Sequence, residues 1–436
     1  MTTEIPTPTG DLEAELQAVA VRVAAQWDAR DPADSQSAHL RGLSAGTITD
    51  WGLAGEGLKS KQPPISMSGG IPDAATQPKA GLLRAMERAL AVPDDSPLVY
   101  GGPLGYEPLR TEIGKYFARD HAEIPGADHF MLTNGAAGAI DMAASLLLDR
   151  GDVVISEMPT FAGSLRTFRG HGVDVVGVHL DEEGIRLDQV EAQIARLRAE
   201  GRTPRLIYTI PTFHNPTGIT TSLQRRIDLV DLAAREGIYI LEDTAYSELF
   251  FTPERPPTIS SVAGGRGVLT AGTFSKVIAT GLRIGWLQAE PALIDLMLPA
   301  RFDMGNSPLL HRMLHEFMVG GEFAPHVEQM RRVYSDKVDA LTETLRDAGE
   351  PYFDFTKPEG GFFLWLRLRE GLNCRDVQQA GFEEGAIFAP GVVFYPGGDP
   401  DGDQDALRLA YSWTRIDDLV AGAERVLAAC ARVSGK

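Results

Sequence analysis

The clearest candidate for a reactive group is a lysine in a short polar turn. In TAGTFSKVIATGLRIGW (residues 270–286), an apolar run ends in small residues that carry Thr273, Ser275 and Lys276. Arg283 follows seven residues after the lysine. Hydroxyls, backbone amides and a guanidinium at such a turn suit a phosphate group, because arginine offers planar, bidentate donors. A lysine beside a phosphate site can form a Schiff base with an aldehyde cofactor. The alternative is a solvated lysine and a surface ion pair of Arg283.

A second polar segment follows an apolar run, and two prolines stiffen its turn. In YTIPTFHNPTG (residues 208–218), Pro211 and Pro216 lie on either side of Asn215. Proline restricts the backbone, so the Asn215 amide is presented in a fixed direction. The alternative is ordinary turn chemistry, because asparagine favours turns on its own account.

A carboxylate and a phenol lie at the end of another apolar run. In IYILEDTAYSEL (residues 238–249), Asp243 closes the run and Tyr246 follows three residues later. Parallel α/β sheets bind ligands at the carboxyl ends of their strands, which is where this carboxylate would lie. Alternatively, Asp243 serves only the turn, and Tyr246 is a packed aromatic with an exposed hydroxyl.

Short apolar runs alternate with helical stretches between about residues 80 and 290. Strands that alternate with helices indicate a mainly parallel sheet covered by helices on both faces. The helical stretches include LRAMERAL and LQRRIDLVDLAAREG. The expected strands are HFMLT, VVISE, VDVVGVHL, RLIYTI, IYILED, VLTAG and IGWLQA.

The two ends of the chain have different patterns. Residues 11–27 place apolar side chains at helical spacing and predict one amphipathic helix. Residues 31–64 are rich in Gly, Ser and Asp and predict a surface loop. Later, longer amphipathic helices and the runs GGFFLWLRL and ALRLAYS predict a smaller α+β domain built from both chain ends. We therefore expect an N-terminal arm at 1–65, a large α/β domain at 66–300 and a small domain at 301–436.

The composition narrows the possible partners and the cellular setting. The chain of 436 residues has a formal net charge of −19 and a pI near 4.9. Nucleic acids and anionic membranes bind clustered Lys and Arg, so neither is an expected partner. The two cysteines, Cys374 and Cys430, form no CxxC pair, which favours a reducing, cytoplasmic setting. We expect no secretory signal at the acidic start and no membrane span.

Taken together and in this order, the motifs resemble the fold-type I pyridoxal-phosphate enzymes, in particular the class I and II aminotransferases. The most similar branch is that of the kynurenine/α-aminoadipate aminotransferases, which the catalytic domain of MocR-type regulators shares. The resemblance extends from about Ser66 to Ala429. It implies an aspartate-aminotransferase-like large α/β domain, a smaller α+β domain, and pyridoxal 5′-phosphate as cofactor. No metal ligand is expected.

The resemblance implies a role for each matching residue around the cofactor ring. Lys276 matches the Schiff-base lysine, which also shuttles the substrate proton. Asp243 matches the aspartate that pairs with the pyridinium nitrogen and keeps it protonated. Asn215 and Tyr246 match the pair that hydrogen-bonds the ring hydroxyl oxygen. Phe161, in EMPTFAGS, matches the aromatic that stacks on the ring.

The same resemblance implies contacts to the phosphate and to the substrate. The expected phosphate ligands are Thr273, Ser275, Arg283 and the amides of Gly135, Ala136 and Ala137 at a helix N-terminus. Tyr100 matches the tyrosine that reaches the phosphate of the partner subunit, which implies a homodimer with shared sites. Arg408 matches the arginine that clamps the substrate α-carboxylate, with Asn215 beside it. Gly69 and Gly70 match the glycines that pass over the substrate.

The chain departs from the family pattern in three places. Ala136 and Ala137 stand where that branch usually has Ser and Gln, so the phosphate loses side-chain donors there. His214 stands where a glutamine usually precedes the asparagine. It is either an added acid/base group or a plain substitution in the turn, and we favour the latter. Residues 303–313 match only loosely, which leaves the substrate open.

Three functional hypotheses follow. The leading one is transfer of an amino group between an amino acid and a 2-oxo acid. The second is another pyridoxal-phosphate reaction on the same scaffold (β- or γ-substitution, cyclisation or decarboxylation), because the same lysine, aspartate and arginine serve it. The third, a MocR-like regulator, needs a basic DNA-binding domain before the fold. Residues 1–60 carry nine acidic and four basic side chains, so we reject it. The combined motifs argue against a fourth hypothesis, that of an α/β protein without a cofactor.

Overall fold

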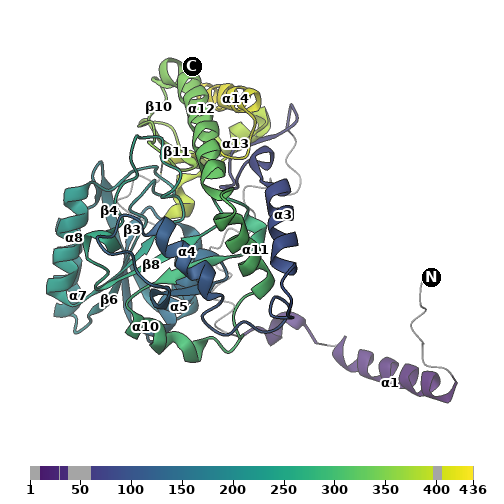
Figure 1. The fold of residues 1–436 in the computed structure, drawn as a ribbon. Helices are drawn as coiled ribbons and strands as arrows, with labels where there is room; N and C mark the ends of the chain where they lie inside the picture. Colours follow the sequence, from purple (N-terminus) through teal and green to yellow (C-terminus); the bar gives the residue numbers. More distant parts are fainter. Residues whose placement is uncertain (1–9, 29, 38–59, 396–404, 436) are drawn as a thin grey trace. The chain divides into compact units, whose positions relative to one another are not determined.

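The structure is a computed structural model that describes residues 10–28, 30–37, 60–395 and 405–435. The chain divides into two compact units, residues 1–47 and 48–436. Figure 1 shows their helices and strands coloured along the sequence.

The first unit contains the expected amphipathic helix, α1 (Asp11–Trp27). None of its residues is buried, and its apolar side chains are exposed. A short 3-10 helix, η1 (Pro32–Ser35), follows, and the Asp31 side chain caps it by accepting a hydrogen bond from the Ala33 amide. The loop predicted at 31–64 lies largely outside the described residues.

The main sheet of the second unit confirms the predicted fold class. Its strands lie in the order β2-β9-β8-β7-β6-β3-β4-β5. Strands β3, β4, β6, β7 and β8 run parallel, whereas β9 is antiparallel to both β8 and β2, and β5 is antiparallel to β4. The bounds are β2 (Phe130–Thr133), β3 (Val153–Met158), β4 (Asp174–Asp181), β5 (Gly184–Ile185), β6 (Pro204–Thr209), β7 (Tyr239–Asp243), β8 (Val268–Thr273) and β9 (Gly285–Gln288). Each apolar run predicted as a strand is therefore a strand.

Consecutive residues of the central strands face opposite sides of this sheet, as the two-residue period of a strand requires. One face packs on α5 (Gly135–Leu147) and α6 (Ala162–Gly170), and the other on α7 (Leu187–Ala199) and α8 (Leu223–Glu236). The strand residues on the first face are Val154, Leu206, Leu241 and Leu269. Those on the second face are Ile155, Ile207, Ile240 and Val268. Both faces are buried, which explains why the strands are almost wholly apolar.

A second, antiparallel sheet is built from the C-terminal part of the chain. Its order is β10-β11-β14-β13. The bounds are β10 (Phe353–Asp354), β11 (Phe363–Leu368), β13 (Ala389–Pro390) and β14 (Ala406–Ala410). The helices of this part are α12 (Phe323–Gly349), α13 (Cys374–Glu384) and α14 (Ile416–Ser434). The early strand β1 (Ile65–Ser66) pairs in parallel with β12 (Ala386–Ile387), so the start of this unit joins its C-terminal part.

The second unit has further short and long helices outside the two sheets. They are η2 (Ala74–Thr76), α3 (Lys79–Leu90), α4 (Glu107–Phe117), η3 (Ala127–His129), α9 (Ile259–Val262), η4 (Thr280–Leu282), α10 (Pro291–Met297), η5 (Leu298–Ala300), α11 (Pro308–Val319) and η6 (Gly391–Phe394). In the part of the chain that the structure describes, no helix is long and apolar enough to cross a bilayer.

Candidate active site

The predicted site residues follow from where three parallel strands end. Strand β7 ends at Asp243, and β8 ends at Thr273, three residues before Lys276. Strand β6 ends at Thr209 and leads into the turn that carries Asn215. Because β6, β7 and β8 run parallel, their carboxyl ends meet at one edge of the sheet. Local strand boundaries thus bring three of the motifs together.

The amine of Lys276 lies at the centre of this group. Its Nζ donates a hydrogen bond to the Gly70 carbonyl oxygen at 2.7 Å and lies 5.6 Å from the centroid of the Tyr246 ring. Burial lowers the pKa of Lys276 to about 8, with Asp243 opposing this shift and Arg408 adding to it. The amine is therefore neutral, and so nucleophilic, at a lower pH than an ordinary lysine.

Asp243 is a buried carboxylate that is held by two donors. Its side chain is only 4% exposed. Oδ1 accepts a hydrogen bond from the Ala245 amide at 3.1 Å, and Oδ2 accepts one from the Tyr208 hydroxyl at 3.0 Å. Burial raises the pKa of Asp243, while these two donors and Lys276 oppose that rise. Among the described residues, no lysine or arginine forms an ion pair with it.

Arg408, on β14, is a buried cation whose hydrogen bonds go to neutral groups. It is 6% exposed, and Nη1 donates to Asn215 Oδ1 at 2.9 Å while Nη2 donates to the Ser68 carbonyl oxygen. Its Nε has no partner among the described residues. The guanidinium lies over the Phe363 ring, 4.3 Å from its centroid. Burial lowers its pKa to about 10. A buried positive charge without an anionic partner destabilises the fold, so this guanidinium is suited to binding an anion.

Asn215 links Arg408 to the phenol of Tyr246. Its Nδ2 donates to the Tyr246 hydroxyl at 3.5 Å, at the long limit of a hydrogen bond. Tyr246 is fixed by edge-to-face packing on Phe362 and Phe363, with ring centroids 5.7 and 5.5 Å away. Burial raises the pKa of Tyr246, so the phenol keeps its proton. The amide and the phenol can both donate to one acceptor.

A set of anion-binding groups lies beside the lysine. Gly135, the first residue of α5, has φ +68°, and a Cβ there would lie 3.0 Å from Arg283 Nη2. The hydroxyls of Thr273 and Ser275 are 2.9 Å apart, and Thr273 pairs in register with Gly285, which also abuts Gly135. A helix N-terminus, two hydroxyls and a guanidinium therefore converge, and this combination suits a phosphate.

Arg283 is held in an uncommon backbone conformation, and its guanidinium can still bind an anion. Its φ is +54°, in the left-handed region that non-glycine residues rarely adopt. Its guanidinium donates only to the carbonyl oxygens of Asn134 and Thr280, both at 3.3 Å. No described carboxylate lies within ion-pair distance of it. Backbone strain of this kind is typical of functional sites.

Phe161 and Tyr100 are two aromatic residues that were predicted to contact the cofactor ring and the phosphate, respectively. Phe161 is half-buried, immediately precedes α6, and packs its ring against Gly163, where an added Cβ would lie 2.5 Å from it. Tyr100 is 84% exposed and has no described contact with the phosphate ligands. Of the two alanines that follow Gly135 at the start of α5, Ala136 is half-buried and Ala137 is exposed. Their place at the helix start leaves only backbone donors, as expected.

His214 is buried, and its side chain contacts Thr217 and Glu157. It is 1% exposed, its Nδ1 lies 2.8 Å from the Thr217 hydroxyl, and its Nε2 lies 3.2 Å from Glu157 Oε2. The last contact lacks hydrogen-bond geometry. Glu157 also accepts from the Thr209 hydroxyl and the Ile210 amide. Through Thr217 and Glu157, His214 supports the turn that carries Asn215.

Sequence reasoning missed two parts of the site. Tyr208, inside the quoted segment YTIPTFHNPTG, contacts Asp243, and the Ser68 carbonyl contacts Arg408. The apolar run around Tyr208 contained a signal, because a phenol in a fully buried strand needs a hydrogen-bond partner. Nothing in the local sequence pointed to a backbone carbonyl of Ser68.

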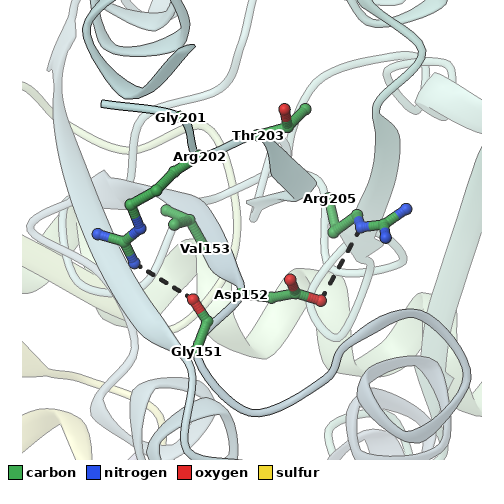
Figure 2. Close-up of a pocket in the computed structure, with 7 residues that line it drawn as sticks. All are labelled: Gly151, Asp152, Val153, Gly201, Arg202, Thr203 and Arg205. Atoms are coloured by element: carbon green, nitrogen blue, oxygen red, sulfur yellow. Dashed lines mark hydrogen bonds and ion pairs between the residues drawn. The ribbon is translucent and has the colours of Figure 1, made fainter. Parts of the chain in front are cut away.

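A hollow of about 460 Å³ lies elsewhere, at the amino ends of β3 and β6. Figure 2 shows Arg202 reaching the Gly151 carbonyl and Arg205 reaching Asp152 across it. Arg202 also pairs with Asp174 at 2.5 Å. Because ligands of α/β sheets bind at the carboxyl ends of strands, this hollow is not the active site.

The charges of the residues around Lys276 fit pyridoxal 5′-phosphate. Three groups that lack an ionic partner among the described residues surround Lys276, and they are Asp243, Arg283 and Arg408. The protonated ring nitrogen of the cofactor would satisfy the first, and its phosphate the second. A substrate carboxylate would satisfy the third. An α/β fold with this arrangement defines a fold-type I pyridoxal-phosphate enzyme.

Comparisons with known proteins agree with this class. The family model described as aminotransferase class I and II matches residues 67–419, so the chain belongs to this family. The 2-aminoadipate transaminase of Thermus thermophilus is 32% identical over 85% of this chain and 91% of its own length. The aromatic-amino-acid aminotransferase 1 of Thermococcus litoralis is 30% identical over 83% of this chain and 87% of its own.

A solved structure extends the agreement to three dimensions. It is the α-aminoadipate aminotransferase of Thermus thermophilus complexed with N-(5′-phosphopyridoxyl)-L-leucine, and it superposes with a TM-score of 0.77 at 30% identity. The match covers 91% of this chain and 95% of that one. The predicted family, fold type and cofactor are thus confirmed, and the chain is a pyridoxal-phosphate-dependent aminotransferase.

Proposed function

We propose that the chain moves an amino group between an α-amino acid and a 2-oxo acid, with pyridoxal 5′-phosphate attached to Lys276. The observation that carries this is the set of three unpaired charges around one amine whose pKa is lowered to about 8. When bound, the cofactor supplies an aldehyde and a ring that accepts electrons from the substrate.

Each of the chain's own residues has a distinct task in this proposal. Asp243 would hold the proton on the ring nitrogen of the bound cofactor, and Phe161 would stack on its ring. Asn215 and Tyr246 donate to the ring oxygen, because both are held in position by their own contacts. The phosphate ligands are Thr273, Ser275, Arg283 and the amides of residues 135–137.

Lys276 has a second task once a substrate amine has displaced it. Its amine would take a proton from the substrate α-carbon and later give that proton back, and a neutral amine is needed to accept it. The hydrogen bond to the Gly70 carbonyl would hold the amine over the site when it is not attached to the cofactor. The glycine segment therefore acts as both cover and positioning contact.

Arg408 selects substrates by their α-carboxylate. Its guanidinium is already oriented by Asn215 and by the rings of Phe363 and Phe394, so little side-chain freedom is lost on binding. A carboxylate would replace the Ser68 carbonyl as the partner of Nη2 and reach the free Nε. Relatives named for 2-aminoadipate and aromatic amino acids also act on compounds that carry this group.

Replacing Arg408 with lysine should weaken amino-acid binding by about ten- to a hundredfold, the worth of one or two hydrogen bonds to a charged group. Lysine keeps the charge but cannot form the planar fork. The test follows 2-oxo acid release and amino transfer to a second 2-oxo acid, with α-amino acids and their decarboxylated amines compared. The resting spectrum of the variant should match the wild type. The role of Arg408 would be contradicted if the wild type used decarboxylated amines as well as amino acids. Transamination would be contradicted if the enzyme released a leaving group without transferring an amino group.

We propose in addition that the protein is a two-fold homodimer in which Tyr100 completes the partner's phosphate site. Its exposed ring belongs to an apolar surface with Leu98, Val99, Phe302 and Met304, all at least 46% exposed. The two segments lie side by side, since a Cβ on Gly305 would be 2.6 Å from the Gly102 carbonyl oxygen. Contiguous apolar surface of this kind marks protein–protein contacts, and two-fold dimers are the commonest assembly.

Tyr100→Phe should raise the dissociation constant of the cofactor by about tenfold or more without lowering Tm, because one donor to a charged group is lost. Light scattering should give a dimer. Mixing inactive Tyr100→Glu with inactive Lys276→Ala should restore about a quarter of wild-type activity, since half of the dimers are hybrids with one intact site. A fully active monomer, or no recovery after demonstrated subunit exchange, would exclude shared sites.

We also propose a cytoplasmic location. Cys374 and Cys430 are free and buried, which suits a reducing compartment in which disulfides do not form.

A further inference from the structure

The buried phenol of Tyr208 links two elements of the site. Tyr208 lies on β6, is fully buried, and its hydroxyl is 3.0 Å from Asp243 Oδ2. The Ser164 hydroxyl, on the first turn of α6, lies 2.7 Å from the same phenol oxygen. Ser164 also lies 3.0 Å from the carbonyl oxygen of Phe161, the residue proposed to stack on the ring. One hydrogen-bonded chain therefore connects α6 with the carboxylate.

The direction of this chain follows from the chemistry of its members. An ionised carboxylate only accepts, so Tyr208 donates its single proton to Asp243. The phenol oxygen can then accept from Ser164. Burial raises the pKa of Tyr208, and the nearby charge of Asp243 raises it further, so Tyr208 remains a donor across the working pH range. Edge-to-face packing on Phe168, with centroids 5.5 Å apart, fixes the ring.

Asp243 needs such a donor because its surroundings oppose its charge. Burial and the neighbouring Glu157 both raise the pKa of Asp243. The Ala245 amide, Tyr208 and Lys276 lower it, and Tyr208 is the sole side-chain hydrogen-bond donor to it among the described residues. Lys276 forms no ion pair with Asp243, so among the described residues the Ala245 amide and Tyr208 are the groups that contact the carboxylate directly.

We propose that Tyr208, supported by Ser164, is a positioning residue that keeps Asp243 ionised and aimed at the ring nitrogen of the bound cofactor. The proposal rests on the function proposed above and extends it to a residue that touches neither cofactor nor substrate. With Oδ1 held by the Ala245 amide and Oδ2 by the phenol, the carboxylate plane is fixed, and the remaining lone pairs are free for a ring N–H.

The test uses Tyr208→Phe, which retains the ring and removes the hydroxyl. It leaves Ser164 with the Phe161 carbonyl as acceptor, so no second polar group is orphaned. The full-length protein, freed of cofactor, is titrated by fluorescence with pyridoxal 5′-phosphate and with its analogue that has C–H in place of the ring nitrogen. Tyr239→Phe, on the neighbouring strand β7, is the matched control.

We expect the wild type and Tyr239→Phe to prefer pyridoxal 5′-phosphate over the analogue. Tyr208→Phe should lose about tenfold or more of that preference, because a donor to a charged group is missing, while its affinity for the analogue stays unchanged. A preference equal to that of the wild type overturns the inference. So does an equal loss of affinity for both compounds, which marks a structural role alone.

The pH profile of the loaded enzyme provides a second measurement. Removing the Tyr208 donor removes an influence that lowers the pKa of Asp243, so Asp243 stays neutral up to a higher pH. The acid limb of activity should therefore move to higher pH in Tyr208→Phe, and by less in Ser164→Ala. An unmoved acid limb contradicts the inference. If the wild type itself binds both compounds equally, the role proposed for Asp243 fails, and this inference fails with it.

Discussion

Replacing Lys276 with alanine should reduce turnover by roughly 10²–10⁴-fold or more, the contribution of a placed general acid–base group, because the variant also loses its point of covalent attachment. Borohydride treatment of the wild type should fix the cofactor to the peptide that contains Lys276. The variant should still bind cofactor through the phosphate ligands and Asp243, but more weakly.

Attachment of the cofactor to Lys276 should become faster as the pH rises. Because burial lowers the pKa of Lys276 to about 8, the reactive neutral amine appears as the pH rises through about 8 rather than near 10.5. Lys115→Ala, at an exposed lysine that pairs with Glu112 at 2.7 Å, is the control and should behave as wild type. Borohydride labelling of a different lysine, or of none, would exclude the proposed attachment.

Asp243→Asn should leave the cofactor bound but slow exchange of the substrate α-proton by roughly 10- to 1,000-fold, the factor that a loss of one to three pKa units represents. Asparagine preserves the shape of the side chain and removes the charge that holds the ring proton. The measurement is α-proton exchange with solvent deuterium, followed by NMR, alongside the absorption spectrum of the bound cofactor.

The adjacent residue provides a matched control for this substitution. Glu242 is also fully buried on β7, but it faces the opposite side of the sheet and accepts from the Ile259 and Ser260 amides. Glu242→Gln should therefore lower Tm while leaving α-proton exchange intact. Normal exchange in Asp243→Asn would mean that another group protonates the ring.

Short-range signals in the sequence were sufficient to locate the strands and to predict that three of the candidate motifs meet at one edge of the sheet. Apolar runs of strand length buried on both faces are recognisable without knowledge of their neighbours. Lys276, Asp243 and Asn215 follow such runs directly, and parallel strands place their carboxyl ends together, so these motifs were expected to meet. The helix at 11–27 and the turn prolines around Asn215 are equally local features.

The partners of these residues depended on contacts between distant parts of the chain. Tyr208 and Asp243 are 35 residues apart, Asn215 and Arg408 are 193 apart, and Gly70 and Lys276 are 206 apart. Register between β6 and β7 sets the first pair, and the packing of β14 against the site sets the second. A hydrogen bond requires its two atoms to lie within about 3 Å of each other. The register of a whole sheet and the packing of many side chains decide which distant atoms come that close. A single stretch of sequence therefore does not determine which distant residue will be the hydrogen-bond partner.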